Sequence, residues 1–395
     1  MSRTVLLIGV LIAGTGMTVF AGDYLKPPGP PGSEASRMRT LNEIEPATPI
    51  HSLPFVITNS GKYVVVEDLH GTNGQDGIVV QADNVTIDLN GFTLVGGTGS
   101  GDAIDITGKR QSIAVLNGVV RDWGRYGVYA IDAFYLSVVG ITSISNGWGG
   151  TGSCPGIGLG KNSEVRDCIS NGSKMAGISV KDSSVVRNCK TGGNGHRGID
   201  AQNGSSVIGC SSYDNASDGI AAYHGTTVTR CTAYDNAFRG IFLLDGCTVT
   251  DCTAYGNTNV GFYVGAGVTI TGCSASRNGA HGIYGGGGCI ISDCTAYKNA
   301  GSGIRVTYDA YVKGNTASSN DGAGIEVAGY RNRIEHNHAA SNDIGIDVNY
   351  GQNIIVRNTT ANSTTREYDI ASGNLMGVTR TSLTGADTWD NFDLD

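Results

Sequence analysis

The sequence has little proline, few charged residues and no long apolar run beyond its start. Only 8 of its 395 residues are proline and 16% are charged, whereas 61 are glycine. So much glycine and so little proline suit a succession of tight turns better than a mixed α/β domain. No apolar stretch after residue 21 is long enough to span a membrane. We therefore expect no membrane span in the mature chain.

Basic residues and metal-binding patterns are also scarce. The formal net charge is −8 at pH 7, whereas a nucleic-acid-binding protein needs a basic face. The composition therefore argues against nucleic acid as a partner, although a local basic patch can still hold an anionic ligand. No cysteine or histidine set has the spacing of zinc ligands, so we expect no structural zinc.

A period of 21 residues dominates the chain. Cysteines recur at this period from Cys168 to Cys294, and asparagines from Asn194 to Asn320. Glycine followed by Ile or Phe recurs in phase with them, at Gly156, Gly177, Gly198, Gly219, Gly240, Gly261, Gly282, Gly303, Gly324 and Gly345. So short a fixed period determines the architecture.

Each unit contains two β-branched runs separated by turn signals, with no room for a helix. Such a unit must stack on its neighbours to bury its apolar side, with equivalent residues about 4.8 Å apart. Stacking places the column from Ile157 to Ile283 on one core face, the column from Val165 to Val312 on a second, and the cysteines at a corner. The asparagines are expected at turns, where a short amide tolerates left-handed backbone and bonds to main chain.

The G-I-x-V, V-x-x-C and N pattern resembles the right-handed parallel β-helix family, the fold shared by pectate-lyase-like proteins. The resemblance extends over roughly residues 76–370. It implies an all-β, right-handed parallel β-helix, and the handedness comes from the resemblance alone. Lyases of this fold use a Lys or Arg base on the outer face, with calcium held by acidic residues.

The start of the chain indicates export. Residues 1–21 have the charged, apolar and cleavage regions of a secretory signal peptide, the alternative being an uncleaved anchor. Residues 22–50 form a proline-rich lead-in. We therefore expect a secreted protein, extracellular or periplasmic, and a monomer.

The β-helix domain is predicted over residues 51–370. Residues 51–75 are assigned to an N-terminal cap, because an open coil end exposes unpaired strand edges. Residues 371–395 lose the period and form either a C-terminal cap or an acidic tail. The cysteines of the column are expected to be buried thiols, and adjacent coils leave room for one or two disulfides.

The outer face is where function is expected, because the core of a β-helix is structural. Arg can bind a uronate carboxylate, and Tyr, Lys or His can exchange a proton. The predicted catalytic residues are Lys181, Arg197, Tyr223, His224 and Arg239. The predicted substrate-binding residues are Trp148, His196, Phe242, Tyr263, His281, Tyr284 and Arg305. Trp148 lies in the longest insertion into the repeat, residues 146–155. It is expected to be either a platform on which a sugar ring stacks or a residue that shields the coil edges.

This set of side chains favours an anionic polysaccharide as the partner and β-elimination as the reaction. Arg197 or Arg239 can stabilise the enolate-like charge, while a lysine, tyrosine or histidine moves the proton. Asp200 and Asp218 are predicted to help hold calcium, if the reaction uses it. No lyase motif matches residue by residue, so no catalytic role is carried over from the family.

Two other functions remain open at this stage. A non-catalytic carbohydrate-binding or adhesin-like scaffold is the first, because exposed strands carry polar residues anyway and Arg197–Asp218 is also typical of a ladder contact. A glycoside hydrolase is the second, and it needs paired carboxylates such as Asp200 with Asp218, or Glu326 with Asp347. The in-phase tyrosines Tyr213, Tyr234, Tyr255 and Tyr297 are interpreted as a structural stack.

Overall fold

The computed structural model describes residues 47–97, 99–149 and 154–394. Every regular element within these ranges is a β-strand. No helix capable of crossing a membrane occurs in the described part of the chain. The predicted signal peptide, residues 1–21, and most of the lead-in, residues 22–50, lie outside the described residues.

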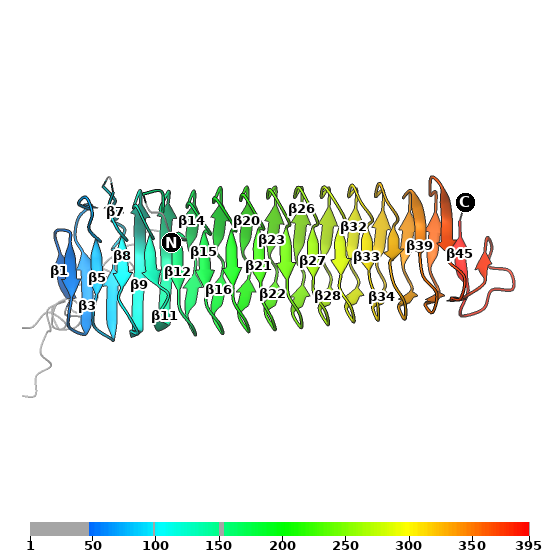
Figure 1. Ribbon diagram of the computed structural model, residues 1–395, viewed down its shortest axis with the longest axis horizontal. Helices are drawn as coiled ribbons and strands as arrows, with labels where there is room; N and C mark the ends of the chain where they lie inside the picture. The colour runs from blue at the N-terminus through cyan, green and yellow to red at the C-terminus, as the bar shows by residue number, and fades with distance from the viewer. Residues whose placement is uncertain (1–46, 98, 150–153, 395) are drawn as a thin grey trace, which may run out of the picture. The chain divides into compact units, whose positions relative to one another are not determined.

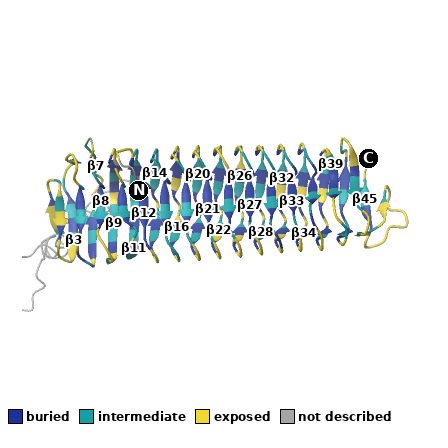
Figure 2. Ribbon diagram, in the orientation of Figure 1, coloured by how far each residue is buried: buried dark blue, intermediate teal, exposed yellow. Residues whose placement is uncertain are grey.

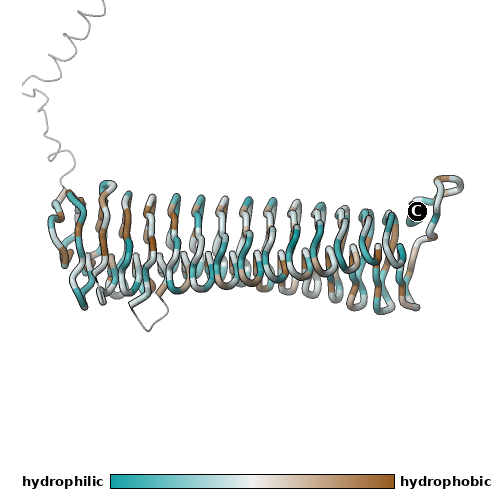
Figure 3. The backbone as a smooth tube through the Cα atoms, turned by 90° about the horizontal axis from the view of Figure 1, so that it is seen from above, coloured by the Kyte–Doolittle hydropathy of each residue, from teal (hydrophilic) through white to brown (hydrophobic). Residues whose placement is uncertain are grey.

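Pro49–Asp395 form one compact unit, in which the chain winds into a parallel β-solenoid. Successive coils stack side by side along one axis (Figure 1), at even spacing when seen from above (Figure 3). Among the described residues, one sheet contains 15 strands, one from each coil. These strands are β2 (Phe55–Ile57), β5 (Ile78–Val80), β8 (Ile104–Ile106), β10 (Val128–Ala130), β12 (Ile157–Leu159), β15 (Ile178–Val180), β18 (Ile199–Ala201), β21 (Ile220–Ala222), β24 (Ile241–Leu243), β27 (Phe262–Val264), β30 (Ile283–Gly285), β33 (Ile304–Val306), β36 (Ile325–Val327), β39 (Ile344–Val348) and β42 (Arg366–Ile370).

A 30-stranded sheet accounts for the remaining described strands, with most coils adding two positions to it. The first position is occupied by β3 (Gly61–Val65), β6 (Val85–Asp88), β9 (Gln111–Arg121), β11 (Phe134–Ile144), β13 (Glu164–Arg166), β16 (Val185–Arg187), β19 (Ser206–Ile208), β22 (Thr227–Thr229), β25 (Thr248–Thr250), β28 (Thr269–Thr271), β31 (Ile290–Ser292), β34 (Tyr311–Lys313), β37 (Arg333–Glu335), β40 (Ile354–Val356) and β43 (Leu375–Met376). The second is occupied by β4 (Leu69–His70), β7 (Thr93–Val95), β14 (Ile169–Asn171), β17 (Lys190–Gly192), β20 (Ser211–Tyr213), β23 (Thr232–Tyr234), β26 (Thr253–Tyr255), β29 (Ser274–Ser276), β32 (Thr295–Tyr297), β35 (Thr316–Ser318), β38 (His338–Ala340), β41 (Thr359–Ala361) and β45 (Asn391–Asp393). The long strands β9 and β11 run through both positions, and β1 (Ala47–Ile50) and β44 (Thr379–Arg380) complete the set.

The predicted core columns are confirmed. Ile178, Ile199 and Ile220 are fully buried, as are Val186 and Val207, and the buried positions follow the strands through every coil (Figure 2). The ten cysteines all lie in the described part of the chain and are buried free thiols. The core therefore forms without the disulfides for which the spacing leaves room.

The asparagine column lies at the turns and bonds to main chain, as predicted, but the left-handed backbone expected there belongs to the preceding residues. Asn215 and Asn236 are buried, and neither has left-handed backbone; the residues before them, Asp214 and Asp235, do. The amide Nδ2 of Asn215 donates to Oδ1 of Asn236 at 2.9 Å, and the backbone N–H of Asn215 donates to the same oxygen. The asparagines therefore form a buried hydrogen-bonded ladder along the axis, which satisfies main-chain groups at the turn.

At each end of the domain, the terminal segment forms strands that pair with the neighbouring coil. Residues 51–75, predicted as the N-terminal cap, supply strands β2, β3 and β4, which pair with β5, β6 and β7 of the next coil. In the predicted cap or tail, residues 371–395, β43 pairs with β40 and β45 with β41. The described part of this terminal segment is therefore ordered against the last coil.

Candidate functional site

The outer face of the 15-stranded sheet carries an outward residue from each regular strand, aligned from coil to coil. In the regular coils, which begin at Gly156 and repeat every 21 residues, this outward column is in register. Asp200 pairs with Ala221, Ala221 with Phe242, and Phe242 with Tyr263. The register confirms the column predicted from the spacing. Its full sequence in these coils is Gly158, Ser179, Asp200, Ala221, Phe242, Tyr263, Tyr284, Arg305, Glu326 and Asp347.

Five of the predicted residues form an arginine–aspartate network, which consists of Arg197, Asp200, Asp218, Tyr223 and Arg239. The Nη1 of Arg197 donates to the Tyr223 hydroxyl at 2.8 Å and to Asp200 at 3.2 Å. Arg239 donates to both oxygens of Asp218, at 2.8 and 3.2 Å. Arg197 Nε lies 3.5 Å from the same carboxylate. Asp218 thus links the two guanidinium groups.

The electrostatics of this network are nearly balanced. Two arginines face two aspartates, and the side chain of Asp218 is only 1% exposed. Burial raises the pKa of Asp200, although Arg197 and His196 oppose the rise. Lys181 also lowers the pKa of Asp200 through its positive charge.

The predicted calcium role of Asp200 and Asp218 does not fit this geometry. Asp218 is buried and both of its oxygens accept hydrogen bonds from Arg239, while Asp200 is bonded to Arg197. The guanidinium groups occupy the positions that a cation would need. The outward, solvated Arg197–Asp218 ladder contact expected from the spacing is likewise a buried contact.

Three carboxylates converge instead on earlier coils, where sequence reasoning did not place a site. Oxygens of Asp76, Asp102 and Asp105 lie within 4.8 Å of one another, and no other such group of three His, Cys, Asp or Glu residues occurs among the described residues. Burial raises the pKa of Asp102 to about 7, against the opposing effects of the Tyr126 backbone N–H and Arg125. This group fits a shared cation better than the predicted pair does. The available sequence signal was the position of these residues: Asp76 and Asp102 each lie two residues before a strand of the 15-stranded sheet, and Asp105 lies within one.

An aromatic row, formed by Phe242, Tyr263 and Tyr284, continues the face beyond the network. The rings of Tyr263 and Tyr284 are stacked, with centroids 4.8 Å apart and an interplanar angle of 2°. Phe242 and Tyr263 lie 5.8 Å apart. The guanidinium carbon of Arg239 lies 3.8 Å from the Phe242 centroid, and that of Arg305 lies 5.6 Å from Tyr284. The row is therefore bounded by an arginine at each end, an arrangement favourable for cation–π contact.

At the end of the row beyond Tyr284, Arg305 forms an ion pair with Glu326. Arg305 Nε lies 3.0 Å from Glu326 Oε1, and the Ser302 hydroxyl donates to Glu326 at 2.7 Å. The backbone N–H of Ser302 donates to His281 Nδ1 at 3.0 Å. Burial lowers the pKa of His281. Its imidazole is therefore neutral near pH 7, with the proton on Nε2.

Two predicted residues lie apart from these contacts. His224 is exposed in the turn after β21. Trp148 lies in the insertion before β12, where its indole N–H donates to the Gly172 carbonyl at 2.8 Å. The tyrosine column is a structural stack in part, since Tyr213 and Tyr234 stack at 5.2 Å on the 30-stranded sheet.

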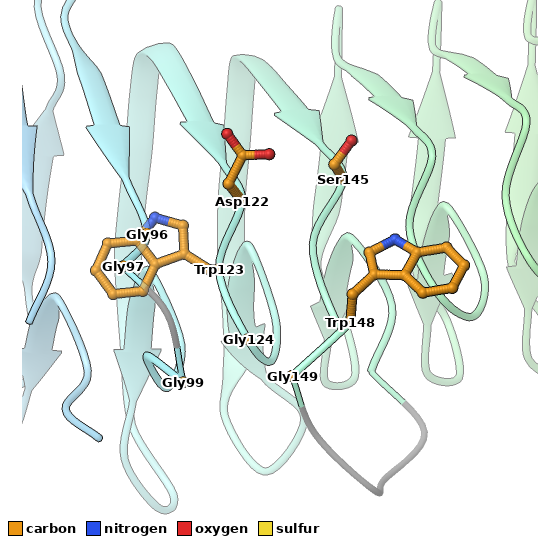
Figure 4. A pocket seen from close by; sticks show the side chains of 9 residues that line it. All are labelled: Gly96, Gly97, Gly99, Asp122, Trp123, Gly124, Ser145, Trp148 and Gly149. Atoms are coloured by element: carbon orange, nitrogen blue, oxygen red, sulfur yellow. The ribbon is translucent and has the colours of Figure 1, made fainter. Parts of the chain in front are cut away.

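A pocket of about 390 Å³ lies beside Trp148 and was not predicted (Figure 4). Its lining consists of two tryptophans, an aspartate, a serine and glycines. These residues are Gly96, Gly97, Gly99, Asp122, Trp123, Gly124, Ser145, Trp148 and Gly149. The only sequence signal was the insertion and its glycines, because the lining comes from three separate coils.

Comparison with known proteins supports the fold. The structure is similar to the mannuronan C-5 epimerase AlgE4 A-module of Azotobacter vinelandii, with a TM-score of 0.53 and 15% identity over 74% of this chain and 90% of that chain. A tailspike protein of bacteriophage CBA120 gives a TM-score of 0.42 and 10% identity over 83% of this chain and 56% of that chain. Curated proteins give no sequence match.

A family model gives the sequence-level match. The model of the right handed beta helix region matches residues 160–268 and 265–380, which together are more than half of the sequence. The repeat, the solenoid and this match agree, and the chain belongs to the right-handed β-helix family.

Proposed function

We propose that the protein is exported, binds a uronic-acid polysaccharide along the outer face of the 15-stranded sheet, and cleaves it by β-elimination. The observation that carries the proposal is the aromatic row between Arg239 and Arg305, directly beside the Arg197–Tyr223 hydrogen bond. Aromatic faces suit the apolar faces of sugar rings, and arginine suits their carboxylates. The row runs along the axis, which is the direction an extended polymer would take.

The reaction assigns different tasks to two side chains. Tyr223 is the proposed base, because Arg197 holds its hydroxyl in place through a 2.8 Å hydrogen bond beside the aromatic row. It removes the proton alpha to the uronate carboxylate, and Arg197 stabilises the enolate-like charge. The C4–O bond then breaks as the C4–C5 double bond forms, and the departing oxygen receives a proton from the tyrosine.

C-5 epimerisation is the second candidate, favoured by the similarity to the A-module of a mannuronan C-5 epimerase. Epimerisation begins with the same proton abstraction, but a proton then returns to the opposite face of the same carbon. No glycosidic bond breaks in that case. The two proposals therefore share a base and a charge-stabilising arginine, and differ in their product.

The test is to incubate the secreted protein with alginate, pectate, glycosaminoglycans and ulvan, with and without calcium. β-Elimination produces an unsaturated uronate, detected by ultraviolet absorbance, whereas epimerisation changes the NMR spectrum of an uncleaved polymer. Tyr223→Phe and Arg197→Ala should reduce turnover at least about a hundredfold, in the range of general acid–base catalysis. Tyr213→Phe, on the 30-stranded sheet, is the matched control and should keep full activity.

The remaining outcomes decide between the alternatives. Binding to one polymer with no product identifies a non-catalytic carbohydrate-binding scaffold. New reducing ends without unsaturated product identify a hydrolase. Full activity in both the Tyr223→Phe and Arg197→Ala variants would show that the reaction occurs elsewhere on the molecule.

A further inference from the structure

The pocket beside Trp148 has the features of a small-ligand site, apart from the arginine–aspartate network and the aromatic row. It lies on earlier coils, between the ends of β9 and β11 and residues 148–149. Trp148 is 63% exposed, which is unusual for so large an apolar side chain. Its indole N–H is already bonded to the Gly172 carbonyl, so the ring is held in one orientation rather than left free to fold back.

Glycines make the floor of the pocket because side chains do not fit there. A Cβ on Gly124 would lie 2.1 Å from the Ser100 carbonyl oxygen, and one on Gly149 would lie 2.9 Å from the Cα of Gly124. Backbone stacks directly on backbone at this corner. The glycines therefore allow consecutive coils to stack closely at this corner, and five of the nine lining residues contribute only main-chain atoms to the pocket.

The polar side chains of the pocket are Asp122 and Ser145. Both have left-handed backbone, with φ of 60° and 53°, which fixes how they project from the ends of β9 and β11. Asp122 forms an ion pair with Arg121, but Arg121 does not line the pocket, so Asp122 is the only charged side chain among the described lining residues. Its carboxylate is 46% exposed and remains available as a hydrogen-bond acceptor. Figure 4 shows Asp122 and Ser145 along one side of the cavity and Trp148 at its end.

We propose that this pocket binds one pyranose ring of a neutral glycan. The indole of Trp148 packs against the C–H face of the sugar, while Asp122 accepts hydrogen bonds from its hydroxyl groups. A mostly preformed concave site with an aromatic wall and a few fixed polar groups is the usual form of a small-ligand site. A uronate would face the Asp122 carboxylate and is disfavoured. The proposal does not depend on the reaction proposed for the sheet face, since neither its residues nor its ligand are shared.

The test is saturation-transfer NMR on the full secreted protein with a panel of neutral mono- and oligosaccharides of glucose, mannose, galactose, xylose and N-acetylglucosamine. Trp148→Ala should weaken binding of the responding sugar at least tenfold. Trp389→Ala is the matched control: Trp389 is 50% exposed, but Arg357 lies 4.2 Å from its ring. That variant should bind as the unmodified protein does.

A second variant separates the polar contribution from folding. Asp122→Asn preserves the size of the side chain and its tolerance of left-handed backbone, and should weaken binding several-fold. Its thermal unfolding should match that of the unmodified protein. Equal binding by Trp148→Ala and the unmodified protein would overturn the proposal. So would the absence of binding by every neutral sugar in the panel.

Discussion

The irregular coils, which precede Gly156, and the regular coils that follow it fill the space between stacked coils in different ways. In the regular coils identical side chains repeat and bond to their own copies, as Asn236 and Asn257 do at 2.9 Å. In the irregular coils a single large side chain, Trp123, fills the core at 1% exposure. Repetition provides a uniform scaffold, and departures from it provide the pocket and the converging carboxylates. Candidate sites therefore appear where the repeat varies.

Trp123 shows how an irregular coil is filled. Its ring lies where Cβ atoms of Gly71 and Gly77 would be, at 2.5 and 2.7 Å. Its indole N–H donates to the Leu94 carbonyl at 3.0 Å. The tryptophan thus fits only because glycines on an earlier coil leave space for it.

The largest expected effect is in the irregular coils. Trp123→Ala should lower the free energy of unfolding by about 3–5 kcal/mol, because a large buried side chain is replaced by a cavity. Hydrogen exchange should show the loss first in β5, β8 and β10, since solenoid stability is not uniform. Trp148→Ala is the control and should change stability by less than about 0.5 kcal/mol. Similar losses in both variants would contradict the assignment of Trp123 as a core residue.

In the regular coils the asparagine ladder should be the most sensitive feature. Asn236→Ala removes the acceptor of Asn215 and leaves buried polar groups unpaired, at a cost of about 1–3 kcal/mol. Denaturant titration followed by circular dichroism measures this cost. Asn203→Ala, at an exposed turn, should shift the transition only slightly. A ladder variant as stable as the turn variant would show that these hydrogen bonds contribute little.

The outward column is the part of the regular coils in which the residue changes from coil to coil. Substitutions in this column should change polysaccharide binding rather than stability. Tyr263→Ala removes the middle ring of the aromatic row and should weaken polysaccharide binding by about 1 kcal/mol, roughly fivefold. Affinity electrophoresis in gels containing the responding polymer measures the change. Tyr234→Ala, from the structural stack with Tyr213, serves as the control. Equal retardation of the two variants would remove the aromatic row from the binding surface.

The smallest effect is expected in the cysteine ladder. The backbone N–H of Cys210 donates to the Cys231 sulfur at 3.4 Å, and a thiol is a weak acceptor. Cys231→Ala should therefore cost about 1 kcal/mol or less, measured by the same titration as Asn236→Ala. A loss equal to that of the asparagine variant would show that packing of the buried sulfur stabilises the cysteine ladder as much as hydrogen bonds stabilise the asparagine ladder.

The period alone determined much of this protein. A 21-residue repeat fixed the solenoid, the buried columns and the register of the outward column, because strands that stack in parallel place equivalent residues one above another. The positions of Phe242, Tyr263 and Tyr284 on one face followed directly. Handedness came from the family resemblance, since spacing does not encode it.

Only the tertiary structure decided which side chains bond to one another. The spacing predicted that Asp218 lies beside Arg197. It did not predict that Arg239 binds Asp218 in a buried contact. The spacing also predicted that the asparagines lie at turns. It did not predict that they form hydrogen bonds with each other across coils. The convergence of Asp76 with Asp102 and the pocket beside Trp148 arise where insertions break the period. A repeat specifies backbone position, whereas rotamers, burial and contacts across an insertion depend on neighbours that the period does not set.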